Sequence, residues 1–551
     1  MSNAWNQPAM PATRFESMFG DRVVRTFARR PENFDALVRE SIARNPQAEV
    51  FVHAGTRLTY AAFDERLDAI AAALASRGIS EGDRVGILCD NSIPAMLALF
   101  AVIRLGAIAV PMGTRQQRPE LEYVFNDAGI VALVFDSALA DRLPPPDVTP
   151  ALRHRFAVGD AGEEAEPFSA LLEPAPFSRR SIDEARPAII MYTSGTTGRP
   201  KGAVLPHVAM VHTAMHFVQC LGHSASSRAL LTIPASHISG LGAVVMAMLR
   251  AGGCVVIDGA FRASSFLARM EAERITFTVL VPAMYKLCLL DPALGETDLS
   301  HWNIGLFGGA IMPPATIAQL AERLPHLQLI NAYGATETTS PATIMPPGRI
   351  GEATDSVGHT VPCGDIKVMD DDFREVEPGT AGELWIGGPM IATGYWNNPE
   401  ATAENFTAGY WHSGDVGSID ASGFVRVFDR KKDMINRGGY KIYSAEVENI
   451  LVRHPDVIET VVVGRPDSVL GERVHAFVCA RGPELHEAEL AAFCATEMSD
   501  YKIPESWTIL QEPLPRNANG KFEKRRLAAE AAALGPMKRV GVQSSLAVHG
   551  N

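Results

Sequence analysis

The loop Tyr192–Gly202 (YTSGTTGRPKG) gathers four Ser/Thr hydroxyls, three glycines and two cations in eleven residues. Glycines let backbone N–H groups approach an anion closely and a lysine adds a point charge, so this composition suits a triphosphate. A flexible polar surface loop is the alternative, but the fixed order of hydroxyls, Gly-Arg-Pro and Lys-Gly disfavours it. The residues expected to bind phosphate are Thr193, Ser194, Gly195, Thr196, Thr197 and Lys201.

This loop differs from the phosphate-binding pattern of the P-loop nucleotidases, which requires Gly-x-x-x-x-Gly-Lys-Ser/Thr. Here Arg199 and Pro200 separate Gly198 from Lys201, and Gly202 stands where a magnesium-binding hydroxyl would be. The sequence therefore disfavours the usual phosphoryl-transfer ATPase.

A second polar segment, Asn331–Thr338 (NAYGATET), follows a predicted strand. Tyr333 offers a flat face for a purine, and Gly334 allows a close approach to the backbone. Thr336 and Glu337 provide oxygen ligands of the kind that Mg²⁺ prefers. A polar turn without a ligand is the alternative, so the segment is a candidate nucleotide and metal site.

Three later segments combine glycine with charge. Asp415 follows a glycine in Trp411–Asp415, and a carboxylate can accept two hydrogen bonds from a ribose diol. Asp429–Asp433 is a run of five charges, and Lys521 ends Pro515–Lys521 (PRNANGK). Each segment alone is typical of a solvated turn, because runs of charged residues usually lie in solvent. Their order along the chain makes them informative.

In this order and spacing, the segments resemble the motifs of the adenylate-forming superfamily. That superfamily comprises acyl-CoA synthetases, luciferases and the adenylation domains of peptide synthetases. The resemblance spans roughly residues 35–530 and is greatest to a stand-alone AMP-forming acyl-CoA ligase. One mild departure is Ser413, where family members usually have Thr.

The resemblance implies a role for each motif. Asp415 and Arg430 would contact the ribose, Lys432 would be the pivot of a hinge, and Lys521 would be the catalytic lysine. His237 would lie beside the substrate carboxylate, although a packed histidine near a helix start is the alternative. The adenine and acyl sites would be lined by Gly308, Gly309, Ala310, Asn331, Ala332 and Tyr333. The pantetheine channel would be covered by Arg437, Gly438 and Gly439.

The implied reaction uses ATP, Mg²⁺ and CoA. A carboxylate attacks the α-phosphate of ATP to give an acyl-adenylate, and the CoA thiol then displaces AMP. At about 4 Å and an effective dielectric near 20, one pair of like charges costs roughly 4 kcal/mol. Lys521 is expected to offset this repulsion by charge and positioning. Glu337 and Thr336 are the expected metal ligands.

The acid is less well defined by the sequence. Gly240, Gly242 and Ala243 are predicted to leave room near the site, and Ala332 replaces a glycine common in aryl-acid relatives. These features favour an aliphatic or alicyclic, fatty-acid-like substrate. Two alternatives stay open: an aryl acid similar to cinnamate or benzoate, and a separate carrier protein as the acceptor. A nucleotide sensor without catalysis is disfavoured, because a sensor need not keep Lys201, Glu337, Asp415, Arg430 and Lys521.

The elements that must position these motifs alternate between helix and strand from about Asn33 onward, which predicts an α/β fold with mostly parallel sheets flanked by helices. Residues 1–30 look irregular, and a β-rich subdomain is predicted after about residue 350. We expect an N-terminal AMP- and acyl-binding domain at 1–429, a hinge at 430–432, a mobile α+β C-terminal domain at 433–534 and a disordered tail at 535–551.

Composition sets further limits on the 551-residue chain. Its formal charge is −13 and no long basic stripe is present, so nucleic-acid binding is not expected. Seven widely spaced cysteines fit reduced, mostly buried thiols and a cytoplasmic protein. Two apolar stretches, Ile93–Met112 and Ile238–Ile257, contain charged and helix-breaking residues and read as a helix, a turn and a strand. A peripheral membrane association and a homodimer stay open.

A serine hydrolase is the remaining rival, because Gly78–Gly82 fits Gly-x-Ser-x-Gly. The nucleophile elbow needs a strand before the serine and a helix after it. The predicted order here is the reverse, so the segment is expected to be the turn that ends a helix.

Overall fold

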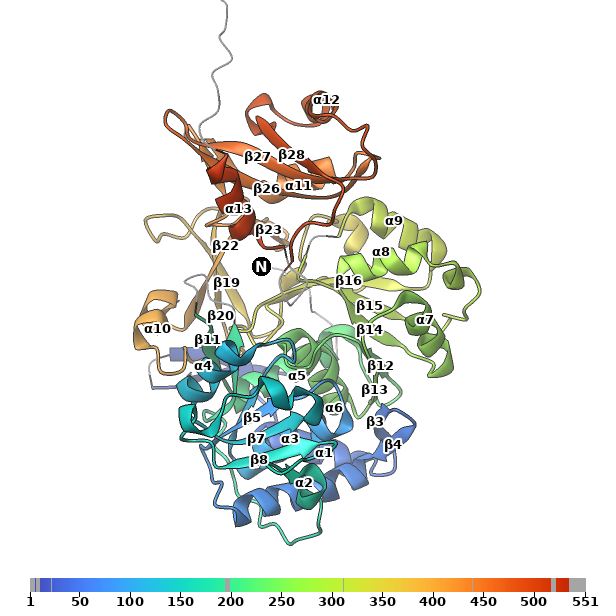
Figure 1. Cartoon of the computed structure of the whole chain (residues 1–551), viewed down its shortest axis with the longest axis vertical. Coiled ribbons are helices and arrows are strands. Elements are labelled where there is room, and N and C mark those ends of the chain that lie inside the picture. The colour runs from blue at the N-terminus through green and yellow to red at the C-terminus, as the bar shows by residue number, and fades with distance from the viewer. Residues whose placement is uncertain are drawn as a thin grey trace, which may run out of the picture. The chain divides into compact units, whose positions relative to one another are not determined.

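The structure, a computed structural model, describes residues 5, 10–20, 22–193, 199–310, 312–438, 440–516 and 522–534. The chain forms two compact units (Figure 1). The large unit contains residues up to Ser413 together with Gly417–Val427. The small unit contains Gly414–Val416 and the chain from Phe428 onward.

The first sheet of the large unit runs in the order β11-β10-β6-β5-β7-β8-β9. The pair β10–β11 is antiparallel and the other pairs are parallel. The strands are β5 (Arg84–Leu88), β6 (Ile108–Pro111), β7 (Ile130–Asp136), β8 (His154–Val158), β9 (Glu166–Pro167), β10 (Pro187–Thr193) and β11 (Lys201–Pro206).

The second sheet runs in the order β18-β17-β16-β15-β14-β12-β13-β3-β4 and is parallel from β16 to β3. The strands are β3 (Glu49–His53), β4 (Thr56–Thr59), β12 (Arg228–Leu231), β13 (Cys254–Ile257), β14 (Phe277–Leu280), β15 (Ile304–Phe307), β16 (Gln328–Tyr333), β17 (Thr343–Ile344) and β18 (His359–Thr360).

One hydrophobic core joins helices to strands of both sheets, and a second packs α7, α8 and α9 against the second sheet, beside β14–β16 in Figure 1. The helices are α1 (Phe34–Arg44), α2 (Tyr60–Ser76), α3 (Ile93–Leu105), α4 (Arg118–Ala128), α5 (His207–Leu221), a π-helix (Ser239–Met246), α6 (Ala247–Ala251), α7 (Ala263–Ala272), α8 (Pro282–Leu290), α9 (Pro314–Arg323) and α10 (Pro399–Asn405). The predicted α/β fold is therefore confirmed.

Local sequence explains where the first helices begin and end. The side chains of Asn33, Thr59 and Ser92 accept backbone N–H groups at the starts of α1, α2 and α3. Gly106 follows α3 with φ 83°, a left-handed conformation that favours glycine. Short 3₁₀ turns occur at Ser137–Arg142, Pro146–Val148, Phe168–Leu171, Pro292–Gly295, Ile350–Glu352 and Asp500–Lys502.

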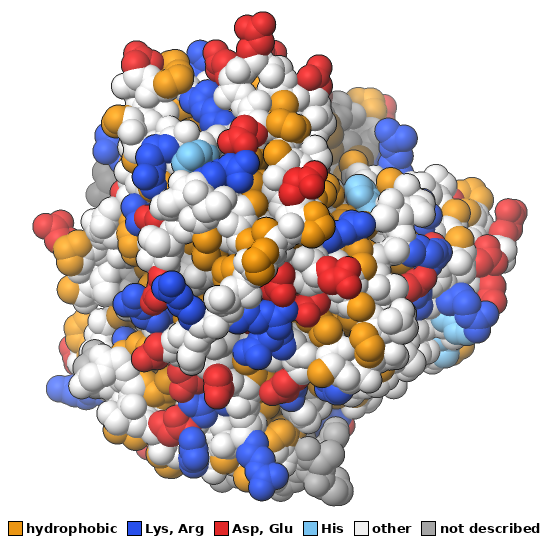
Figure 2. Space-filling view, turned by 90° about the horizontal axis from the view of Figure 1, so that it is seen from below, with side chains coloured by type: hydrophobic (Ala, Val, Ile, Leu, Met, Phe, Trp, Pro, Cys, Tyr) orange, Lys and Arg blue, Asp and Glu red, His pale blue; other side chains and the backbone are white. Residues whose placement is uncertain are grey.

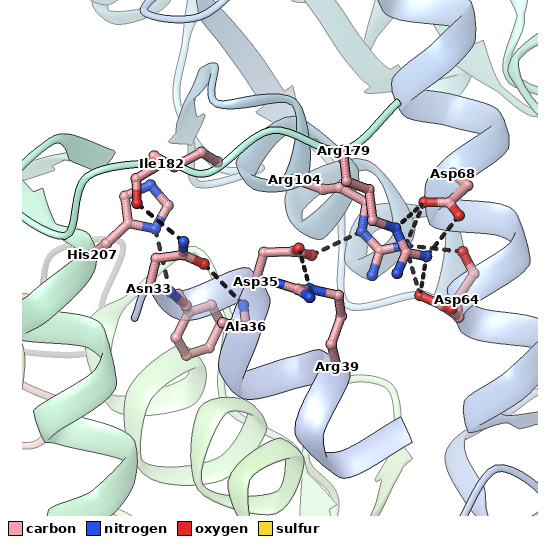
Figure 3. Close-up of polar contacts among 11 residues, drawn as sticks. Asn33, Asp35, Ala36, Arg39, Asp64, Asp68, Arg104, Arg179, Ile182 and His207 are labelled. Carbon is pink, nitrogen blue, oxygen red and sulfur yellow. Dashed lines mark hydrogen bonds and ion pairs between the residues drawn. The ribbon is translucent and has the colours of Figure 1, made fainter. Parts of the chain in front are cut away.

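A cluster of ion pairs fixes α1, α2 and α3 to one another (Figure 3). The fully buried side chain of Arg104 on α3 contacts Asp35 of α1 at 2.8 Å, and Asp64 and Asp68 of α2 at 2.7 and 2.8 Å. Arg179 reaches the same two α2 carboxylates. Because three carboxylates face these cations, burial of Arg104 is compensated, and we assign the cluster a structural role.

The predicted β-rich subdomain is also present. Its sheet contains β19 (Asp365–Met369), β20 (Gly382–Gly387), β22 (Tyr410–Ile419) and β21 (Phe406–Thr407), and β23 (Val425–Arg430) pairs with β22. The small unit has β24 (Ile435–Arg437), β25 (Tyr440–Ile442), α11 (Ser444–Leu451), β26 (Val457–Asp467), β27 (Gly471–Ala480), α12 (Glu487–Glu497), β28 (Ser506–Leu510) and α13 (Lys524–Ala533).

The expectation that residues 1–30 are irregular was wrong for residues 13–18 and 22–27. β1 (Thr13–Met18) and β2 (Arg22–Phe27) pair as an antiparallel ribbon, in which Thr13 lies opposite Phe27. Phe15 and Val23 are exposed while Thr26 is buried, so apolar and polar residues do not alternate along its sequence as they would on a typical half-buried strand. The expected tail, 535–551, lies outside the described residues.

The structure also bears on the serine-hydrolase alternative, on the apolar stretches and on the cysteines. Gly78–Gly82 follows α2 and precedes β5, so Ser80 is not at a nucleophile elbow. Over the ranges that the structure describes, every helix is too short or too polar to span a lipid bilayer. All seven cysteines are free and buried. On the face shown in Figure 2, acidic and basic side chains are interspersed.

Candidate active site

The predicted phosphate loop connects two paired strands, β10 and β11. Thr193 ends β10 and lies opposite Lys201, the first residue of β11. A Cβ on Gly202 would lie 2.7 Å from Ile190 Cγ2, so glycine is required for this close pairing. The structure thus places Thr193 and Lys201 side by side. The other expected phosphate ligands, Ser194, Gly195, Thr196 and Thr197, lie outside the described residues.

The two segments expected to line the adenine site lie next to each other. β15 and β16 are parallel neighbours, with Phe307 opposite Asn331. The segments Gly308–Ala310 and Ala332–Tyr333 come next in the chain and therefore lie at the same edge of the sheet. A Cβ on Gly308 would lie 2.4 Å from the carbonyl oxygen of Ala332, and Gly309 has φ 74°. Ligands of parallel sheets bind beyond the carboxyl ends of the strands, where these segments lie.

Glu337 is 7% exposed and lies in a turn beyond β16. Its Oε1 accepts a hydrogen bond from the Tyr395 hydroxyl at 2.9 Å. Lys201 Nζ lies over the ring of Tyr395, 5.2 Å from the centroid of the ring. One aromatic side chain thus contacts both a predicted metal ligand and a predicted phosphate cation. Sequence reasoning missed Tyr395.

The surroundings of Glu337 suit Mg²⁺ better than a metal held by protein ligands alone. In the part of the chain that the structure describes, no group of three or more His, Cys, Asp or Glu side chains could hold a metal ion. Mg²⁺ usually binds one or two carboxylates together with substrate phosphates and keeps several waters. A single buried carboxylate, with Thr336 next to it and Lys201 near, fits that pattern.

The two residues expected at the ribose form an ion pair. Arg430 Nε lies 2.7 Å from Asp415 Oδ1. The Asp415 side chain is 7% exposed and that of Arg430 is 45% exposed. The backbone supports the pair, because the Lys431 N–H donates to the Gly414 carbonyl at 2.7 Å. A buried carboxylate next to a half-exposed guanidinium can accept hydrogen bonds from the two hydroxyls of a ribose that enters from solvent.

The ribose assignment predicts a change in nucleotide selectivity. Asp415→Asn keeps the side-chain shape but removes the charge that favours two diol hydrogen bonds. We expect KM for ATP to rise by about 10- to 100-fold, since a charge-assisted hydrogen bond contributes about 1.5–3 kcal/mol. The preference for ATP over 3′-deoxy-ATP and 2′-deoxy-ATP should shrink as well.

Steady-state kinetics with the three nucleotides measures this effect, and Asp372→Asn, an exposed carboxylate paired with Arg374, is the matched control. An Asp415→Asn enzyme that still discriminates against both deoxynucleotides as the wild type does would contradict the assignment.

The charge run 429–433 is not simply a solvated turn. Asp429 is 7% exposed, and its Oδ2 accepts hydrogen bonds from the backbone N–H and, at 2.7 Å, the hydroxyl of Ser444 at the start of α11. Lys524 on α13 donates to Ser444 Oγ at 2.6 Å and pairs with Glu448 at 2.9 Å. Burial lowers the pKa of Lys524, but Glu448 and Asp429 together raise it above its ordinary value.

This network predicts a stability effect. Lys524→Met keeps the length of the side chain but leaves Glu448 without its cation. We therefore expect the free energy of unfolding to fall by about 2–4 kcal/mol. The double variant Lys524→Met/Glu448→Leu should recover part of that loss, because Glu448 is no longer an unpaired carboxylate, although Asp429 still lacks the nearby cation. Chemical denaturation of the three proteins measures it. Equal stability of the single variant and the wild type would contradict the role of the pair.

The residues expected at the pantetheine channel are only partly described. Arg437 makes a two-contact ion pair with Glu505, at 3.1 and 2.7 Å, and Gly438 has φ 58°. Gly439 and the expected catalytic lysine, Lys521, lie outside the described residues.

The predicted room near His237 is contradicted at Gly240. A Cβ there would lie 2.4 Å from the Pro234 carbonyl oxygen, so this glycine serves close backbone packing and not an open space. At Gly242 a Cβ would meet Thr213 and the Thr339 carbonyl at 3.4 and 3.5 Å, and Ala243 is buried. His237 is partly buried just before the π-helix.

The chain is similar to known proteins over most of its length. The family model "AMP-binding enzyme" matches residues 38–396, and the model "AMP-binding enzyme C-terminal domain" matches residues 446–521. The chain is 34% identical to a feruloyl-CoA synthase of Amycolatopsis sp, over 87% of this chain and 95% of the relative. It is 30% identical to a long-chain-fatty-acid–CoA ligase of Mycobacterium tuberculosis, over 92% and 100%.

Other relatives differ in the thiol acceptor and in the acid that their names give. A fatty acid–[acyl-carrier-protein] ligase of Streptomyces coeruleorubidus is 33% identical over 86% of this chain and 91% of its own length. Among solved structures, the fold matches an anthranilate CoA ligase in complex with anthranoyl-AMP, with TM-score 0.84, 24% identity and coverage of 91% and 98%. It also matches an o-succinylbenzoate CoA synthetase from Bacillus subtilis in complex with its acyl-adenylate, with TM-score 0.78, 28% identity and coverage of 89% and 97%.

Proposed function

The chain belongs to the AMP-binding enzyme family, and we propose that it joins a carboxylic acid to CoA in two steps, through an acyl-adenylate and with release of pyrophosphate and AMP. The observation that carries this proposal is the convergence of Lys201 and Glu337 on Tyr395. A cation and a carboxylate that meet at one aromatic side chain support a site for a magnesium nucleotide.

In the first step, the residues of the chain bind ATP at its three parts. Tyr333 stacks on the adenine, Asp415 and Arg430 hold the ribose, and Lys201 with the loop 193–201 holds the β- and γ-phosphates. When bound to Glu337 and Thr336, Mg²⁺ supplies positive charge that offsets the charge of the triphosphate. Lys521 bridges the carboxylate and the α-phosphate, so that the attacking oxygen reaches phosphorus against reduced repulsion.

In the second step, the thiol of CoA attacks the carbonyl carbon of the adenylate, and AMP leaves with the bridging oxygen. The adenylate is a mixed anhydride that water destroys, so the thiol must arrive while water is excluded. We infer that the domain 433–534 turns about a hinge at 430–432. Lys521 then leaves the site, and the segment 437–439 takes its place beside the pantetheine.

For the acid we propose an aliphatic or alicyclic chain. Ala332, which replaces a glycine common in aryl-acid relatives, supports this choice. The glycines near His237 do not, because Gly240 is filled by backbone. An aryl acid is the second candidate, since the 34% identical feruloyl-CoA synthase is named for one.

A carrier protein is the alternative acceptor, and the 33% identical carrier-protein ligase favours keeping it as a candidate. The two acceptors are separated by supplying CoA as the only thiol. Acyl-CoA formed under that condition would support the CoA ligase. Release of pyrophosphate without acyl-CoA would indicate a carrier-protein ligase.

The proposed function is tested with purified protein, ATP, Mg²⁺, CoA and a panel of acids that spans short, long, alicyclic and aryl carboxylates. We expect acid-dependent release of pyrophosphate and AMP, with acyl-CoA as the second product. Release of ADP and phosphate in place of AMP and pyrophosphate would contradict the proposal.

A further inference from the structure

Tyr395 lies between two groups that the proposed function uses. Its hydroxyl donates to Glu337 Oε1 at 2.9 Å, and its ring centroid lies 5.2 Å from Lys201 Nζ. Tyr395 and Glu337 are 8% and 7% exposed, so their hydrogen bond is shielded from water, and Lys201 is partly buried. The strength of a cation–π contact rises from about 0.5–1 kcal/mol at the surface to about 2 kcal/mol when desolvated.

The backbone around Tyr395 ties these two groups together. We name residues 391–396 the strap. The strap donates from Ala392 to the Glu337 carbonyl at 2.8 Å and from Trp396 to the Gly202 carbonyl at 2.7 Å. It also exchanges two 3.0 Å hydrogen bonds with Val204. It therefore joins the turn that holds Glu337 to the strand that begins at Lys201.

The direction of the tyrosine side chain is fixed locally. Gly394 has φ 149°, and a Cβ there would lie 2.6 Å from Thr402 Cγ2, so other residues are disfavoured. The hydroxyl of Thr402 accepts the Tyr395 N–H at 2.9 Å. Beyond the ring, the Trp396 indole N–H donates to the Asp127 carbonyl at 3.2 Å. The aromatic ring is thus held before any ligand arrives.

We propose that Tyr395 is a positioning residue, whose hydroxyl orients Glu337 toward a divalent cation and whose ring holds Lys201 toward the triphosphate. This inference rests on the proposed function. The phenol fixes the plane of the carboxylate, as hydrogen-bonded neighbours of metal ligands do. The aromatic face attracts the ammonium without neutralising it, so the full positive charge is kept for phosphate.

Two substitutions separate the hydroxyl from the ring. Tyr395→Phe removes the hydrogen bond to Glu337 and keeps the ring, whereas Tyr395→Leu removes both. The probe is Mn²⁺, whose binding to the enzyme is followed by electron paramagnetic resonance with a non-hydrolysable ATP analogue present. Binding of the same analogue is measured by calorimetry without metal. Tyr410→Phe is the matched control, because Tyr410 donates its hydroxyl to the carboxylate of Asp365 on another strand pair.

We expect Tyr395→Phe to weaken Mn²⁺ binding about tenfold, as loss of a neighbour of a metal ligand typically does, with analogue affinity without metal unchanged. Tyr395→Leu should also weaken the analogue alone, by about fivefold for 1 kcal/mol of lost cation–π attraction. Tyr410→Phe should change neither affinity.

Wild-type Mn²⁺ binding by Tyr395→Phe would overturn the inference. Equal losses in both assays for the two Tyr395 variants, with a lowered melting temperature, would overturn it too, because the residue would then be purely structural. Wild-type protein that binds no nucleotide would overturn the proposed function and this inference together.

Discussion

Lys521→Ala is expected to lower the rate of adenylate formation by about 10³-fold, and to leave thioester formation from a supplied acyl-adenylate unchanged. The reason is that the carboxylate and the α-phosphate are both anionic only in the first step. Loss of one preorganised group at such a transition state typically costs about 10²–10³ in rate. In the second step the nucleophile attacks a neutral carbonyl, and Lys521 has no charge to bridge.

The measurement uses the two half-reactions separately. Exchange of labelled pyrophosphate into ATP reports the first, and release of AMP from synthetic acyl-adenylate with CoA reports the second. Lys286→Ala, on an exposed part of α8, is the control for loss of a lysine charge. Equal losses in both half-reactions would remove Lys521 from the role of bridging cation.

Glu337→Gln is expected to lower adenylate formation by about 10²-fold or more, and to shift the Mg²⁺ dependence to higher concentration. The amide keeps the size of the side chain and an oxygen that can accept the Tyr395 hydroxyl, but it lacks the charge that Mg²⁺ requires. Because the loss is in metal affinity, part of the activity should return at high Mg²⁺.

The comparison that isolates this effect is a Mg²⁺ titration of wild type, Glu337→Gln and Glu352→Gln. Glu352 is an exposed glutamate paired with Arg349, so its substitution removes a carboxylate charge at the surface. A Glu337→Gln enzyme with the Mg²⁺ dependence of the wild type would exclude Glu337 as a metal ligand.

Much of the large unit could be predicted from the sequence because its elements are long and buried. The stretch Ile93–Met112 was expected to be a helix, a turn and a strand, and α3 and β6 occupy it. β7 is a continuous apolar run from Ile130 to Phe135, typical of a strand inside a parallel sheet, and it is buried. The β1–β2 ribbon could not be found this way, because its exposed apolar residues, Phe15 and Val23, and its buried Thr26 hide the alternation in the sequence.

The sequence predicted that some residues of the candidate site lie together, but it did not predict contacts that depend on packing. Asp415 and Arg430 were expected to share one ligand group, and the structure pairs them. The prediction of space at Gly240 failed, because the sequence does not show which backbone atom a glycine faces. Gly394, just before Tyr395, was the available sequence signal for the strap. The signal could not be interpreted from the sequence, because Tyr395 contacts Glu337, which lies 58 residues earlier in the chain.

The buried network around Lys524 illustrates the same limit. Asp429 stands in a run of charges that looks solvated, and Lys524 is 80 residues from its partner Ser444. Only the fold shows that these charges meet at the start of α11. The rule that charge runs are solvated holds for exposed residues such as Lys431 and Lys432, but not for Asp429.

The central claim is that a carboxylate oxygen attacks the innermost phosphorus of ATP, and isotope transfer tests it most directly. An accepted acid labelled with oxygen-18 in both carboxylate positions is turned over with ATP and CoA, and the products are weighed by mass spectrometry. We predict that each AMP carries one oxygen-18 atom from the acid and that pyrophosphate carries none. Unlabelled AMP, or label in inorganic phosphate, would contradict the account.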